Sequence, residues 1–172
     1  KMLHLIKMWL KAPVEETDER GNRRLSAGKK ATRGTPQGGV VSPLLSNIYL
    51  HEVMDQWFER VVKPRLRGRA FMIRFADDMV LCFENEADAR AVLGVLPKRF
   101  ARYGLALHPE KTRLVRFDSP NLKGGDPGTF DFLGFTHHWG RTLRGMWTIK
   151  RRTAADRFTR ALGRVADWCR GN

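Results

Sequence analysis

Two adjacent aspartates, Asp77 and Asp78, lie inside an apolar stretch of a strongly basic chain. They belong to the sequence RFADDMVLCF, residues 74–83, in a chain of 172 residues with a formal net charge of +14. Burying two like charges without a counter-ion would cost several kcal/mol. A positive charge must therefore compensate the pair, or the pair must lie at an exposed turn.

Carboxylate oxygens are hard ligands that suit Mg²⁺, which binds through one or two carboxylates together with substrate phosphates. Two such ions can stabilise both the attacking and the leaving oxygen of a phosphoryl transfer. A magnesium site would also supply the positive charge that the pair needs. The alternative is a solvated pair in a turn, where Asp is common, and the dipeptide alone favours that alternative.

The charge of the whole chain favours a polyanionic partner. The sequence holds 32 Lys and Arg against 18 Asp and Glu, with six basic residues and no acid in residues 20–33. Residues 141–170 hold nine basic residues against two acids. Nucleic acid is the commonest partner of such a chain, and the alternative is a merely basic soluble protein. No run approaches the ~18 apolar residues that cross a bilayer, so we expect no membrane partner.

Helices and a hairpin are expected before the aspartates. Apolar residues on one helical face predict a helix over residues 1–11, followed by a polar hairpin over residues 14–33 that turns at Gly21-Asn22. A glycine-rich loop then leads to a helix that begins at Ser42-Pro43 and continues to about Val62. The residues that this helix is expected to bury are Leu45, Ile48, Trp57 and Val61.

The aspartates are expected at the apex of a second hairpin. Residues 71–75 and 79–83 are short and apolar, which predicts two strands joined at residues 76–78. Cys82 lies in the second strand, and together with Cys169 it is expected to be a buried free thiol in a reducing compartment.

Short strands and two helices are expected in the remaining chain. Asn85 is expected to cap a helix that ends at Gly104. Strands are expected at residues 105–107, 113–117 and 130–135, with Gly134 marking a bend or a close backbone approach in the last of them. The last segment is expected to be helical. Its apolar face would hold Phe158, Leu162, Val165 and Cys169. Hairpins mixed with helices predict an α+β domain.

Four stretches, in order, resemble the polymerase motifs of reverse transcriptases, above all of those encoded by group II introns. GTPQGGVVSPLLSNIYL at residues 34–50 resembles motif B, and FADD at residues 75–78 resembles motif C, which usually begins with tyrosine. GLALHPEKT at residues 104–112 resembles motif D, and FDFLGF at residues 130–135 resembles motif E, the primer grip. Four motifs in order are far more specific than any one alone.

The resemblance implies a role for each motif. Asp77 would be a metal ligand and Asp78 its weaker companion, with Mg²⁺ as the cofactor. Lys111 would neutralise or protonate the departing pyrophosphate. The other implied contacts are with the nucleotide or template for Pro36, Gln37, Gly38, Gly39 and Phe75, with the primer end for Phe132, Leu133 and Gly134, and with the nucleic-acid backbone for Arg33, Lys150, Arg151, Arg152 and Arg157.

Structural alternatives remain open for these positions. Lys111 can be a solvated lysine after a turn, and Phe132 and Leu133 can belong to a core strand. The arginines after residue 150 can form the solvated face of an amphipathic segment. His137 and His138 are adjacent on an expected strand and point to opposite faces, so we expect structural or RNA-facing roles rather than a shared metal ion.

One element of the resemblance is missing. The family takes a further metal-binding aspartate from motif A, on an apolar strand upstream of motif B, whereas the acids before Gly34 lie in a polar hairpin. We therefore expect a C-terminal part of the polymerase domain: a partial palm of antiparallel sheet with packed helices over residues 1–149, and the start of a thumb helix over residues 150–172. The open edge of the palm sheet could pair with the missing segment or with another chain.

The resemblance implies an RNA-directed DNA polymerase that extends a primer 3′-hydroxyl with deoxynucleotides in the bacterial cytoplasm. Its partners would be an RNA template or intron RNA and a DNA primer. This chain alone is expected to be inactive, because motif A is missing. The alternative is an RNA-binding, maturase-like splicing module that does not polymerise. A two-metal nuclease is a weaker interpretation, because no nuclease spacing of carboxylates and lysine is found.

Overall fold

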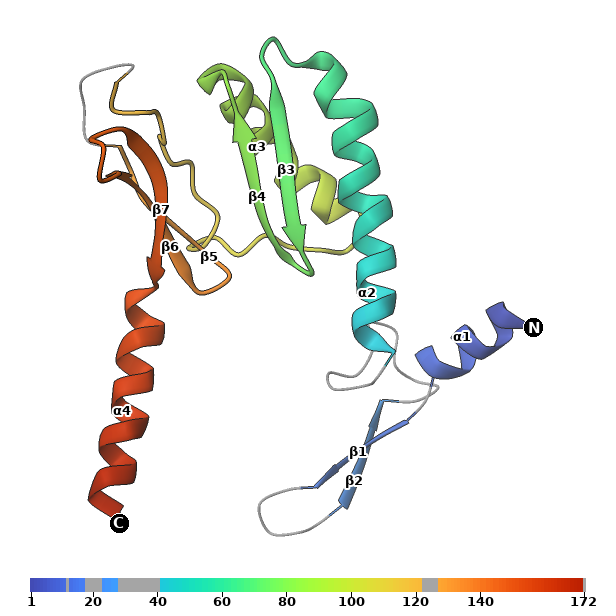
Figure 1. Ribbon diagram of the computed structural model, residues 1–172. Coiled ribbons are helices and arrows are strands. Elements are labelled where there is room, and N and C mark those ends of the chain that lie inside the picture. The colour runs from blue at the N-terminus through green and yellow to red at the C-terminus, as the bar shows by residue number, and fades with distance from the viewer. Residues whose placement is uncertain (12, 18–22, 28–40, 122–126, 172) are drawn as a thin grey trace. The chain divides into compact units, whose positions relative to one another are not determined.

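The structure, a computed structural model shown in Figure 1, describes residues 1–11, 13–17, 23–27, 41–121 and 127–171. The chain divides into two compact units, Lys1–Asp55 and Gln56–Asn172. The expected loop of motif B, with Pro36, Gln37, Gly38 and Gly39, lies outside the described residues, as does Arg33. None of the helices in the described part of the chain has the length and apolar character needed to span a bilayer.

The first unit holds a helix, a hairpin and a second helix. Helix α1 spans Met2–Leu10, as predicted. Strand β1 (Pro13–Thr17) pairs antiparallel with β2 (Arg23–Ala27), which confirms the hairpin, while its predicted turn lies outside the described residues. Helix α2 spans Ser42–Leu50 with a proline in its first turn. The expected hydroxyl cap is wrong, because Val41 is the capping residue and no side chain caps this end.

Helical turns also occupy residues 51–65, where the helix widens and then tightens. Segments η2 (His51–Asp55) and η3 (Phe58–Val62) are π-helical, with i→i+5 hydrogen bonds, and η4 (Lys63–Arg65) is a 3₁₀ turn. The predicted helix over residues 42–62 is therefore present, but its regular 3.6-residue period ends at Leu50.

The predicted buried face is wrong, and the change of period accounts for its second half, after Leu50. Ile48 and Val61 are 55% and 39% exposed, and Leu45 and Trp57 are only half-buried. The buried positions of η3 are Phe58 and Val62. Each lies one residue after a predicted position, because a π-turn accommodates an extra residue and rotates the face that follows it.

The second unit builds its core around a two-stranded sheet and a helix. Strand β3 (Ala70–Phe75) pairs antiparallel with β4 (Asp78–Phe83), and α3 (Glu86–Arg102) packs beside β4. Asn85 caps α3 as predicted: its side-chain oxygen accepts from the Ala87 amide at 2.9 Å. The residues of α3 that face the core are Ala89, Val92, Leu96 and Phe100.

The expected strands at residues 105–107 and 113–117 are wrong. Both segments are described, and neither pairs in a sheet. A strand needs a partner edge, and here Arg116 accepts only one such bond, from the Gly128 amide at 2.9 Å. The apolar residues of this segment pack by their side chains instead, with the Phe117 ring 5.0 Å from that of Phe130 and 5.7 Å from that of Trp139.

A three-stranded antiparallel sheet and a long helix complete the second unit (Figure 1). The strands are β5 (Phe130–Phe132), β6 (Phe135–Arg141) and β7 (Trp147–Thr153), in that order, and helix α4 spans Ala155–Gly171. The bend expected at Gly134 is confirmed, but the single strand expected over residues 130–135 is wrong, because a two-residue turn divides it. The last helix begins later than expected, since residues 150–153 belong to β7.

The chain is α+β, as predicted, while its division into palm and thumb stays a prediction. The apolar face expected on α4 is exposed in the structure, with Phe158 at 56%, Leu162 at 54% and Val165 at 59%. Cys82 and Cys169 are also exposed, so the expectation of buried thiols is wrong. Cys82 lies on a two-stranded sheet too small to cover it fully, yet partial desolvation still raises the pKa of its thiol.

Candidate active site

The two aspartates lie at the exposed turn of the β3–β4 hairpin. Phe75 pairs with Asp78 across the two strands, so Ala76 and Asp77 alone form the turn and Asp78 is the first residue of β4. The predicted three-residue apex is therefore one residue too long. The Arg74 guanidinium donates to the Ala76 carbonyl at 2.8 Å, which supports the left-handed Ala76 (φ 53°). Both carboxylates are exposed, so the pair does not bear the cost of burial.

Phe75 and Asp78 face the same side of the hairpin. They are directly opposite in the antiparallel register, and such partners project to one face. Phe71, Ile73 and Phe75 alternate along β3 on this face and are 60%, 56% and 64% exposed. An open apolar surface therefore leads up to the Asp78 carboxylate, and the aromatic residue predicted to contact the nucleotide lies next to a predicted metal ligand.

The donor set at this turn fits Mg²⁺ in part. Two adjacent, exposed carboxylates match an ion that keeps several waters and completes its coordination with substrate phosphates. Among the described residues no group of three or more His, Cys, Asp or Glu could hold a metal ion. The hairpin therefore offers two ligands, and any third carboxylate must come from outside the described residues.

Lys111 lies in a different turn. It follows His108 and Pro109, and the turn is closed by a hydrogen bond from the Thr112 amide to the His108 carbonyl at 3.0 Å. The side chain is exposed. In the described part of the chain no hydrogen bond or ion pair joins Lys111 to Asp77 or Asp78, so its predicted catalytic role depends on a substrate that bridges them.

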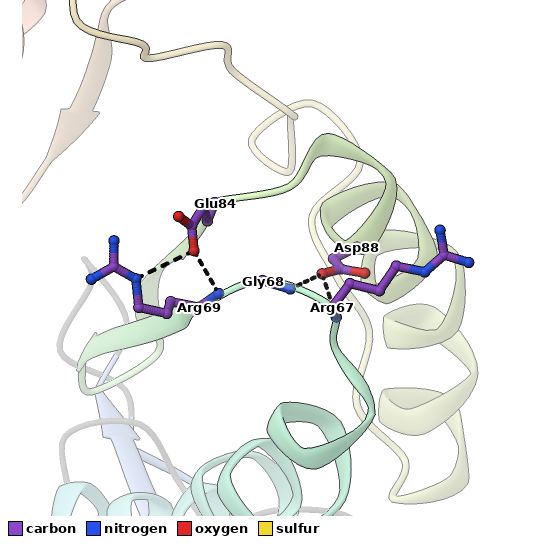
Figure 2. Close-up of polar contacts among 5 residues, drawn as sticks. All are labelled: Arg67, Gly68, Arg69, Glu84 and Asp88. Carbon is purple, nitrogen blue, oxygen red and sulfur yellow. Dashed lines mark hydrogen bonds and ion pairs between the residues drawn. The ribbon is translucent and has the colours of Figure 1, made fainter.

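Two further carboxylates hold the other end of the hairpin (Figure 2). One oxygen of Asp88, a buried residue in the first turn of α3, accepts from the Arg67 and Gly68 amides, each at 2.9 Å. Glu84, at the end of β4, accepts from the Arg69 amide at 3.0 Å and from its Nε at 3.3 Å. The amides of three consecutive residues before β3 thus find carboxylate acceptors, on Glu84 directly after β4 and on Asp88 of α3. These hydrogen bonds fix the start of β3 to the end of β4.

The electrostatics of this end follow from those bonds. Hydrogen bonds from the Arg69 amide and side chain, with the charge of its guanidinium, hold the pKa of Glu84 below its ordinary range. Sequence reasoning missed both acids, although one signal was available. Asp88 lies three residues after the Asn85 cap, where acidic residues often satisfy amides near a helix start.

The predicted primer grip is a tight turn. Leu133 and Gly134 separate the paired residues Phe132 and Phe135, and both have positive φ, 53° and 80°. Leu133 is 39% exposed and Phe132 is half-buried. The turn therefore presents one apolar side chain outward while its neighbour packs on the sheet.

The basic residues predicted to grip nucleic acid do not form one row. Lys150 and Arg152 point to one face of β7 and Arg151 to the other, because strand residues alternate. All three are exposed. Arg157 lies on α4, where it lines a surface hollow with Arg160 and Arg164, and it also reaches the Leu133 carbonyl at 3.5 Å.

His137 and His138 lie next to each other on β6. The His137 ring stacks on Phe130 with centroids 4.9 Å apart and planes 5° from parallel. The Nδ1 atoms of both histidines are buried and find no hydrogen-bond partner among the described residues. His137 is thus a packing residue of the sheet.

Comparison with known proteins identifies the family. The family described as reverse transcriptase (RNA-dependent DNA polymerase) matches residues 1–137, which extends the resemblance upstream of Gly34 to the first residue. No solved structure matches the chain significantly.

Several relatives agree with that match. The group II intron-encoded protein LtrA of Lactococcus lactis is 47% identical over 80 residues, which cover 41% of this chain and 13% of LtrA. Protein YkfC of Escherichia coli is 30% identical over 149 residues, 69% of this chain and 36% of YkfC. Telomerase reverse transcriptase of Takifugu rubripes is 29% identical over 104 residues, 59% of this chain and 9% of the telomerase protein.

The chain thus spans between 9% and 36% of the length of these relatives. The family match covers most of its 172 residues and includes the hairpin that carries the two aspartates. This chain belongs to the reverse transcriptase family.

Proposed function

We propose that this chain is the part of an RNA-directed DNA polymerase of group II intron type that carries the paired aspartates of its active site. One observation supports this most directly: Asp77 in the exposed turn and Asp78 at the start of β4 are adjacent, with Phe75 paired to Asp78, in a chain that belongs to the reverse transcriptase family. The similarity to LtrA favours the group II intron type.

The residues have distinct tasks in this proposal. Asp77 and Asp78 would hold Mg²⁺, which when bound stabilises negative charge on the reacting phosphates and lowers the pKa of the primer hydroxyl. Phe75 offers an apolar surface beside the acids for the incoming nucleotide. Lys111 donates a proton to the leaving pyrophosphate, and residues 132–134 support the primer end.

Substitution of one aspartate tests the proposal. In a polymerase that contains this chain, D77A should reduce primer extension by at least about 10³-fold, because a metal ligand is removed. Its affinity for RNA should stay within about twofold, or rise, since a negative charge leaves a basic protein. The matched control is D167N, which removes an exposed acid paired with Arg170 on α4 and should leave extension unchanged. Normal extension by D77A would contradict the proposal.

A second proposal concerns the chain of 172 residues by itself. It should not extend primers, because the sequence lacks the motif A aspartate that the family resemblance calls for. Among the described residues no third His, Cys, Asp or Glu joins the two hairpin carboxylates in a group that could hold a metal ion. Primer extension with purified chain, RNA template and Mg²⁺ tests this directly. Robust extension would contradict it.

An RNA-binding, maturase-like module is the second candidate, and the net charge of +14 supports it. Nucleic-acid binding by itself needs no carboxylate pair at a turn. The D77A experiment separates the two candidates, since a pure binding module would lose no function with Asp77. If D77A retained splicing assistance and no extension were seen even in the unaltered protein, the binding module would be favoured.

A further inference from the structure

The turn between β5 and β6 has an unfavourable backbone. Leu133 and Gly134 both adopt positive φ, and a branched, bulky residue such as Leu133 rarely does so. Such a conformation persists only when the surrounding structure determines it. Contacts with this turn therefore decide whether the predicted primer grip keeps its shape.

Two contacts reach the turn from the start of α4. The Ala154 amide donates to the Gly134 carbonyl at 3.0 Å, and the Ala154 carbonyl accepts the hydrogen bond from Phe158 that begins the helix. Arg157, in the first turn of the helix, donates from its guanidinium to the Leu133 carbonyl at 3.5 Å, which is a long and weak hydrogen bond. The polar contact alone would thus hold the turn only loosely.

The steric contact is closer. A Cβ atom on Gly134 would lie 3.0 Å from Cδ and 3.1 Å from Cζ of Arg157, and would overlap Nη1. The arginine side chain therefore lies flat across Gly134 and fills the space that any other residue would need. The φ of 80° favours glycine at position 134, and a Cβ atom there would also displace the arginine side chain from the turn.

We propose that Arg157 is a positioning residue. It fixes the Leu133-Gly134 turn to the first turn of α4, so that the hairpin turn and the helix move together. This gives Arg157 a different role from the nucleic-acid backbone contact expected from the sequence. The inference rests on the proposed function only for what the turn does, namely support of the primer end. The contact itself exists without any nucleic acid.

Arg164 provides a matched control. It lies seven residues after Arg157, lines the same hollow and carries the same charge. In the described part of the chain it makes no contact with the turn. Loss of charge on α4 should therefore be equal in R157A and R164A, whereas loss of support for the turn should be confined to R157A.

Hydrogen exchange of the Ala154 amide reports on the turn directly, because this amide is bonded to Gly134. In the purified chain, R157A should raise its exchange rate about tenfold or more, R164A less than about twofold, and R157K should restore part of the protection by covering Gly134 with its stem. An unchanged exchange rate in R157A would overturn the inference.

A double-mutant cycle gives a second test that survives if one variant is poorly stable. G134A should lower the melting temperature strongly when Arg157 is present, because of both strain and overlap. In an R157A background the further decrease should be clearly smaller, since only the strain remains. Strictly additive shifts would show that the two residues do not touch and would overturn the inference.

Primer extension separates this inference from the proposed function. In a polymerase that contains the chain, R157A should raise the apparent KM for primer several-fold with the KM for nucleotide unchanged, while R164A should alter only the salt dependence of binding. If R157A raises the exchange rate of the Ala154 amide but primer extension is normal, Arg157 positions the turn as inferred and the primer-grip role of the turn is wrong. If exchange is unchanged, the inference is wrong whatever extension shows.

Discussion

Asp88 illustrates how a single buried carboxylate can position a site that it does not touch. It satisfies the Arg67 and Gly68 amides before β3, while the aspartate pair lies at the opposite end of the same hairpin. A Cβ on Gly68 would lie 3.2 Å from the Cβ of Glu84, so the chain is tightly packed here. Substitutions at Asp88 should therefore lower the stability of the folded chain more than they alter the exposed turn at the other end of the hairpin.

D88A should destabilise the folded chain by about 1–3 kcal/mol, because two backbone amides lose their acceptor in a largely buried place. D88N should destabilise the chain less than D88A, since the side-chain oxygen of asparagine can still accept from one or both of these backbone amides. Urea unfolding followed by circular dichroism measures the difference. D167A, which removes an exposed acid, is the control and should change stability little. Equal stabilities of D88A and D167A would contradict the role of Asp88.

Glu84 should make stability depend on pH in acid. Its folded-state pKa lies below the ordinary value of about 4.3, so the unfolded chain binds the proton more readily. The stabilising contribution is therefore fully present above the ordinary pKa and is lost as the pH falls through the lower folded-state pKa. E84Q should melt at a lower temperature than the unaltered chain at pH 7, and this difference should disappear near pH 2. A difference that stays constant over this range would contradict the assignment.

At the residue scale, sequence motifs locate the acids but not the groups that hold them. Asp77 and Asp78 are predicted at a turn because their neighbours on both sides are apolar, and the structure places them there. Asp88 and Glu84 could not be predicted in the same way. The partner amides of Asp88 are 20 and 21 residues away, and the packing of α3 beside β4 brings them to it. Arg69 is 15 residues from Glu84, and the β3–β4 register places the two opposite each other just beyond the paired strand ends.

The elements show where local patterns fail. The β3–β4 hairpin, the Asn85 cap and α3 depend on neighbouring residues, and all are predictable from the sequence. Residues 113–117 resemble a strand because three of the five are apolar, but in the structure they pair with none of the described strands. The change of helical period after Leu50 could not be predicted, because π-turns have no clear sequence signal. At residues 130–135 the glycine predicts the bend at Gly134, but not that the bend is a full turn between two strands, because FDFLGF also fits one bent strand.

Strand β7 gives a prediction at the scale of an element. Lys150 and Arg152 share a face with Gly140, and the Lys150 stem covers that glycine so closely that a Cβ atom there would lie 2.8 Å from the lysine Cδ. Arg151 shares the opposite face, on which Phe117 packs against Trp139. We expect phosphate contacts from the first face, which is free of that packing. The double variant K150Q/R152Q should reduce the salt slope of single-stranded RNA binding by about 1.4, and R151Q should leave it nearly unchanged.

Fluorescence anisotropy with a labelled RNA measures these slopes. Since all three residues are exposed, their loss should not unfold the chain, and circular dichroism controls for this. A larger effect from R151Q than from the double variant would place the nucleic acid on the opposite face.

At the scale of the whole molecule, charge is the property that sequence reports most directly. The net charge of +14 needs no fold to be known, and the basic residues on β7 and α4 are exposed in the structure. Two of the α4 arginines are already paired within the helix, Arg160 with Asp156 at 2.8 Å and Arg170 with Asp167 at 3.1 Å. Such exposed pairs are weak, so a phosphate can compete for the arginine at little cost.

Binding of RNA by the chain should therefore be strongly dependent on salt. With four or more phosphate contacts, the logarithm of the affinity should fall with the logarithm of the salt concentration at a slope of about −3 or steeper. Titrations between about 50 and 200 mM salt, with a neutral polymer as competitor, measure it. D77A should bind with the same slope, because phosphate contacts are made by lysine and arginine side chains and not by a carboxylate. A slope near zero would mean that the charge serves solubility alone, and the nucleic-acid role of this surface would then be excluded.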